Sequence, residues 1–146
     1  MVMITHDLGV VAGLCDFVNV MYAGRIVESA PRHDLFAHPR HRYTEGLLNS
    51  IPRLDAPRGE ALHPIAGTPR DTIAWSKACA FAPRCAHADD ECVTPDLELE
   101  PMGRSGHRVR CVHPAPEDPD LPGATVAIAT SHADNSDGEA RGTSDD

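Results

Sequence analysis

Residues 2–22 read VMITHDLGVVAGLCDFVNVMY, and this pattern predicts a strand, a polar turn, a helix and a second strand. Residues 2–4 form a short apolar run, which is typical of a strand buried on both faces of a parallel sheet. Asp7 is a good N-cap for a helix over residues 8–15, because its carboxylate can accept from free backbone N–H groups. Residues 17–22 suit the second strand. The helix carries its apolar residues at helical spacing: Leu8, Val11, Ala12 and Cys15.

The residues after this unit predict a hairpin and two short helices. Gly24 lies between two β-like runs and supplies the positive φ of a tight turn. Pro31 opens a short helix that Pro39 ends. A second helix carries one apolar stripe, which predicts packing on the same core: Tyr43, Leu47, Leu48 and Ile51. Residues 53–72 are rich in proline, glycine and charge, so we expect a linker there.

Composition limits what the chain can be. Its 146 residues carry a net charge of -9 and only 4% aromatic residues, which favours one small domain with appendages. The acidic balance argues against nucleic acid as a partner. No apolar run is long enough to span a bilayer and no signal peptide is recognisable, so we expect a cytoplasmic chain. Residues 115–146 combine many acids with small polar residues and predict a disordered acidic tail.

His6 directly follows the first predicted strand, where α/β proteins bind their ligands. A histidine at that place can donate a hydrogen bond to a phosphate oxygen. For a lone histidine, a capping or surface role is nevertheless the more common one. Its position alone leaves both interpretations open.

Four of the five cysteines fall in one segment, with five, six and eighteen residues between successive members: Cys79, Cys85, Cys92 and Cys111. A reducing compartment disfavours disulfides, and no pair has the two-to-four-residue spacing that is usual for structural zinc. An iron–sulfur cluster accepts four thiolates at irregular spacings, and free thiols are the simplest alternative. His87, His107 and His113 were further candidate ligands, although four cysteines leave no need for them. Cys15 lies apart, on the apolar face of the first helix, as a small hydrophobe.

Three segments, in this order, resemble the ATP-binding-cassette (ABC) ATPases that drive dipeptide and oligopeptide transporters. They are ITHDLGVVAGLCDFVNVMYAGRIVESA from residue 4, HPRHRYTEGLLNSIPRLD from residue 38, and CAFAPRC from residue 79. The resemblance covers about residues 1–114. It implies an α/β fold, with the C-terminal part of a P-loop nucleotide-binding domain over residues 1–52. An irregular cysteine-rich extension over residues 53–114 and the tail over residues 115–146 would follow.

The resemblance also implies roles for single residues. His6 matches the switch histidine that binds the nucleotide and acts in catalysis, where it contacts the γ-phosphate of Mg-ATP and the attacking water. Asp7 would cap the helix and hold His6 in place. Cys79, Cys85, Cys92 and Cys111 match the positions that hold a 4Fe–4S cluster in some members. Implied partners are transmembrane permease subunits, a second ATP-binding subunit in a homo- or heterodimer and, indirectly, a peptide-binding protein, at the inner face of the cell membrane.

The sequence contains no phosphate loop of the form Gly-x-x-x-x-Gly-Lys-Ser/Thr, no Mg-binding acid at a strand end and no Ser-Gly-Gly-Gln signature. We therefore expect the C-terminal part of a longer importer subunit, one that does not hydrolyse ATP by itself. Two alternatives are a stand-alone iron–sulfur or metal-binding module and a nonfunctional remnant.

Overall fold

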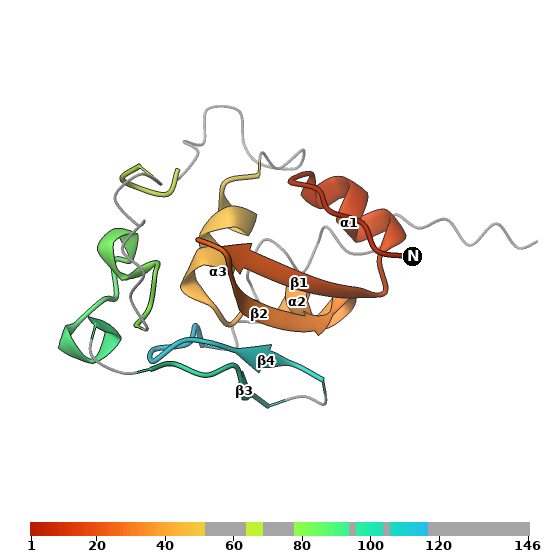
Figure 1. The fold of residues 1–146 in the computed structure, drawn as a ribbon. Helices are drawn as coiled ribbons and strands as arrows, with labels where there is room; N and C mark the ends of the chain where they lie inside the picture. The colour runs from red at the N-terminus through yellow and green to blue at the C-terminus, as the bar shows by residue number, and fades with distance from the viewer. Residues whose placement is uncertain (52–63, 69–77, 94–95, 104–105, 117–146) are drawn as a thin grey trace, which may run out of the picture.

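The computed structural model describes residues 1–51, 64–68, 78–93, 96–103 and 106–116. Figure 1 shows these residues as one small sheet with short helices packed against it. The elements in chain order are α1 (Leu8–Leu14), β1 (Phe17–Tyr22), β2 (Arg25–Pro31), α2 (Arg32–Ala37), α3 (Arg42–Asn49), the 3-10 helices η2 (Ala82–Arg84) and η3 (Asp90–Val93), β3 (Glu100–Pro101) and β4 (Arg108–Val109).

The four strands form one antiparallel sheet in the order β1-β2-β4-β3. β1 and β2 are a hairpin, whose tight turn places Gly24 at a φ of 78° and Ala23 at 47°. On the other side of β2, Glu28 pairs with Val109 of β4. The sheet that begins in the hairpin is therefore completed by residues about eighty positions later in the chain. The described residues combine helices and strands, so the expected α/β class is confirmed.

The core lies on one face of the hairpin. Strand β1 alternates exposed and buried residues, and its buried side is formed by Val18, Val20 and Tyr22. Leu35 and Phe36 of α2 are 0% and 2% exposed against it, and burial of such a side chain contributes about 1.5–3 kcal/mol. The stripe predicted on the second helix packs here as expected: Leu48 is buried, and Tyr43, Leu47 and Ile51 contact the core.

The predicted opening strand over residues 2–4 is wrong. These residues form no strand, and Val2 and Ile4 are 92% and 96% exposed. A strand buried on both faces needs neighbours on both sides, and every ladder in the described part of the chain is antiparallel and lies elsewhere. The helix that follows is confirmed, because α1 begins directly after Asp7 and packs its apolar side on the core.

Two further predictions fall largely outside the described residues. Of the expected linker over residues 53–72, only residues 64–68 are described, and the acidic tail is described only at Ala115 and Pro116. Within the described ranges, none of the helices combines the length and the hydropathy that a bilayer span requires.

Candidate functional site

His6 lies in an exposed bend immediately before α1. The neighbouring Asp7 carboxylate accepts hydrogen bonds from the backbone N–H groups of Gly9, at 2.9 Å, and Val10, at 3.1 Å. The backbone N–H of Asp7 in turn donates to Thr5 Oγ1 at 3.0 Å. The predicted N-cap is therefore confirmed, and it fixes the backbone from which the His6 side chain projects.

The four clustered cysteines come from three separate pieces of chain. Cys79 and Cys85 flank η2, Cys92 lies within η3, and Cys111 follows β4. The Cys79 backbone N–H donates to the Cys92 carbonyl at 3.0 Å, which joins the first two pieces. All five cysteines of the chain are free thiols, so no disulfide links these pieces.

The pKa values of three of these thiols, Cys79, Cys92 and Cys111, are raised. Burial raises the pKa of Cys79, and the charges of Cys92 and Cys85 raise it further. Burial likewise raises the pKa of Cys111 to about 11, with smaller contributions from Cys79 and Cys85. The pKa of Cys92 is also raised by burial, with Cys85 among the minor causes. The set of four cysteines as one metal site therefore stays a prediction.

An aromatic contact and an arginine attach this cysteine segment to the hairpin. Phe81 is 3% exposed, and its ring centroid lies 5.4 Å from those of both Tyr22 and Tyr43. Arg84 donates to the carbonyls of Ile65, Ala66 and Gly67 and to the hydroxyl of Tyr22. These contacts anchor the cysteine segment to the hairpin core and stabilise its position.

The three histidines considered as ligands have different surroundings. His107 is buried, and its Nε2 lies 2.7 Å from Glu28 Oε1. His113 lies beside Cys92, and its Nε2 is 2.7 Å from Asp89 Oδ2. His87 is exposed.

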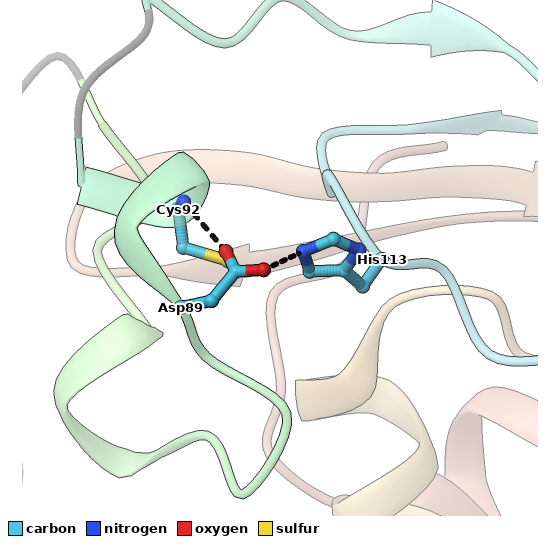
Figure 2. A group of neighbouring side chains, drawn as sticks. All are labelled: Asp89, Cys92 and His113. Atoms are coloured by element: carbon cyan, nitrogen blue, oxygen red, sulfur yellow. Dashed lines mark hydrogen bonds and ion pairs between the residues drawn. The ribbon is translucent and has the colours of Figure 1, made fainter.

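Asp89, Cys92 and His113 form a compact group of potential metal ligands (Figure 2). One ligand atom from each lies within 4.8 Å of the others. Asp89 was not among the ligands expected from the sequence. The only signal that could have found it is its place three residues before Cys92, directly before the start of η3.

The structure does not bring His6 and the cysteines together. In Figure 1 the N-terminal segment and α1 lie at one end of the hairpin, whereas residues 78–93 lie at the other. The candidate nucleotide residue and the candidate metal ligands therefore belong to two separate sites.

Residues 27–92 match the family model for the C-terminal region of oligopeptide/dipeptide transporters. The chain is thus similar to the C-terminal part of oligopeptide and dipeptide transport ATP-binding proteins.

Over the matched stretch, these relatives are about half identical to the chain. The oligopeptide transport ATP-binding protein OppD of Salmonella typhimurium is 51% identical over 104 residues, which are 70% of this chain and 31% of that protein. OppD of Mycobacterium bovis is 50% identical over 109 residues, which cover 75% and 18% of the two chains. The dipeptide transport ATP-binding protein DppD of Bacillus subtilis is 54% identical over 84 residues, which cover 58% and 25%. The matched stretch therefore spans between about a fifth and a third of the length of these relatives.

Proposed function

We propose that this chain supplies the C-terminal part of an ATP-binding subunit in an ABC importer of dipeptides or oligopeptides, in which ATP hydrolysis drives transport. The observation that carries the proposal is the identity of about one half, over 104 to 109 residues, with oligopeptide transport ATP-binding proteins. The division of the chain into residues 1–52, 53–114 and 115–146 is part of the same proposal. The comparisons do not favour a stand-alone module or a remnant.

His6 is proposed as the switch histidine. Its exposed position beside the Asp7-capped start of α1 leaves the imidazole accessible to a γ-phosphate and an attacking water. A hydrogen bond from the imidazole would stabilise the charge that develops as the phosphoryl group leaves. Because the 146 residues contain no phosphate loop, ATP and Mg²⁺ would be bound mainly by residues outside this sequence.

The proposed partners are transmembrane permease subunits, a second ATP-binding subunit and, indirectly, a peptide-binding protein, at the inner face of the membrane. An exposed apolar surface supports such packing. Phe17 and Met21 on the outer side of β1 are 49% and 58% exposed, and Val2 and Ile4 are almost fully exposed. These exposed apolar side chains are the candidates for contact with such a partner.

The transport proposal is tested in a chimera. Residues 1–114 replace the matched segment of an intact relative such as the Salmonella OppD, and ATP hydrolysis and peptide uptake are measured in vesicles with its permease. We expect both activities to be retained, and His6→Ala to nearly abolish hydrolysis while nucleotide binding persists. His33→Ala, at an exposed histidine of α2, is the matched control and should change neither activity. Normal turnover by the His6→Ala chimera would remove His6 from the mechanism.

A 4Fe–4S cluster is proposed at Cys79, Cys85, Cys92 and Cys111. The residues present fit such a group, because all four cysteines are free thiols and the Cys79 backbone N–H donates to the Cys92 carbonyl at 3.0 Å. Four thiolates are the usual ligands of such a cluster. Its role would be structural, since it would join chain segments that have little apolar core of their own.

Protein purified without oxygen should then be brown and contain about four iron and four sulfide per chain. Cys85→Ser should lose the colour, whereas Cys15→Ser, at the C-cap of α1, should keep it. Colourless protein that contains stoichiometric zinc at all four cysteines would reject the cluster.

A further inference from the structure

We propose that Asp89, Cys92 and His113 form a second metal site, which binds a single divalent ion of the zinc class and uses the same Cys92 thiol as the four-cysteine site. Figure 2 shows the three side chains converging from the turn before η3, from η3 itself and from the segment after β4. The site does not depend on any transport activity. This ion and a 4Fe–4S cluster cannot be bound in the same molecule, because each would need the Cys92 thiolate as its own ligand.

The distances suit one small ion. The three ligand atoms lie within 4.8 Å of one another, and His113 Nε2 and Asp89 Oδ2 are already 2.7 Å apart. A tetrahedral zinc ion with bonds of about 2.0–2.3 Å holds its ligand atoms roughly 3.3–3.8 Å apart. Side-chain movements of about an ångström would therefore complete the coordination, without a change in the backbone.

The donor set also selects this class of ion. One thiolate, one imidazole and one carboxylate are a mixed set that suits zinc, whereas Mg²⁺ and Ca²⁺ prefer oxygen ligands alone. Asp89 and His113 have side chains that are 50% and 36% exposed, so the fourth position is open to water. Cys92, in contrast, is 5% exposed and supplies the buried wall of the site.

The carboxylate is held in place before any ion arrives. Asp89 Oδ1 accepts hydrogen bonds from the backbone N–H groups of Glu91, at 3.0 Å, and Cys92, at 3.3 Å. The other oxygen, Oδ2, is directed at His113. Such prior orientation lowers the entropy lost on binding. Without a metal, Asp89 and His113 form an exposed pair that contributes little to the stability of the fold. Folding therefore does not explain why these two residues are placed together.

The experiment uses full-length protein prepared without a cluster, under reducing conditions and without oxygen. Zn²⁺ binding is measured by calorimetry, and Co²⁺ is used as a spectroscopic probe of the ligands. We expect one ion per chain, with a Co²⁺ charge-transfer band of the intensity of a single thiolate. Asp89→Asn and His113→Gln should each weaken Zn²⁺ binding at least about tenfold, because even outer-shell partners of a metal have effects of that size.

Two kinds of control separate this site from the four-cysteine site. Glu91→Gln and His87→Gln change exposed neighbours and should leave Zn²⁺ affinity unchanged. Cys79→Ser should abolish the cluster but leave the single Zn²⁺ bound. The proposal is overturned if Zn²⁺ does not bind stoichiometrically, if Cys79→Ser removes it, or if His113→Gln binds it as tightly as the parent. None of these outcomes affects the chimera experiment.

Discussion

His107 Nε2 and Glu28 Oε1 lie 2.7 Å apart, with the two side chains 2% and 0% exposed. The pair connects the centre of β2 with the residue just before β4. Glu28 also accepts from the backbone N–H groups of Arg40, at 2.6 Å, and His41, at 3.0 Å. One buried carboxylate therefore holds together the hairpin, the start of α3 and the late strand that completes the sheet.

We predict that Glu28→Ala lowers the free energy of unfolding by about 3–5 kcal/mol, because it leaves two buried donors and one partly buried donor without their acceptor. Urea denaturation measures this. The double-mutant cycle with His107→Ala should give an interaction energy of about 1–3 kcal/mol, as for other directly contacting residues. Glu98→Ala, at an exposed acid, should change stability by less than about 0.5 kcal/mol. A Glu28→Ala effect no larger than that of Glu98→Ala would contradict the role given to this carboxylate.

The second prediction concerns pH and His41. Burial lowers the pKa of His41 from 6.5 to about 4, although the charge of Glu28 and the backbone of Arg110 oppose the shift. The unfolded chain takes up a proton below about pH 6.5, whereas the folded chain does so only near pH 4. Stability is therefore highest above pH 6.5 and falls as the pH decreases to 4, by up to about 3 kcal/mol.

The matched variant for this prediction is His41→Asn. His41 caps α3, since its Nδ1 accepts from the backbone N–H of Tyr43 at 3.1 Å. Asparagine is also a good N-cap but does not titrate. Chemical denaturation at several pH values should give a flatter profile for the variant between pH 6.5 and 4. Equal slopes for the two proteins would assign the pH dependence to other groups.

The third prediction concerns Arg84, which donates to three consecutive carbonyls of residues 64–68. Arg84→Met keeps the aliphatic length but removes every donor, so we expect a loss of about 1–3 kcal/mol. Limited proteolysis with mass-spectrometric mapping should show faster cleavage near Ile65. Arg108→Met is the control, because Arg108 donates to the Leu99 carbonyl from an exposed position. If both variants are cleaved at the same rate, Arg84 does not hold this segment.

Much of the local structure could be predicted from the sequence. The Asp7 cap, the Gly24 turn, the strand over residues 17–22 and the apolar stripe of α3 all depend on residues a few positions apart. Such features arise from backbone conformation and short-range hydrogen bonds, so their signals survive in the order of residues. The four-cysteine site, in contrast, stays a prediction, and the structure joins only Cys79 and Cys92 by a backbone hydrogen bond.

Tertiary structure alone decided the long-range features. It determined that residues 2–4 form no strand, that β4 joins β2, and that Glu28 faces His107. Nothing in the order of residues distinguishes a buried glutamate from a solvated one, and a strand of two residues has no periodicity to recognise. Asp89 and His113 are 24 positions apart and meet only because η3 and the chain after β4 dock side by side. Local preferences are determined by neighbouring residues, whereas these contacts exist only after the whole chain has packed.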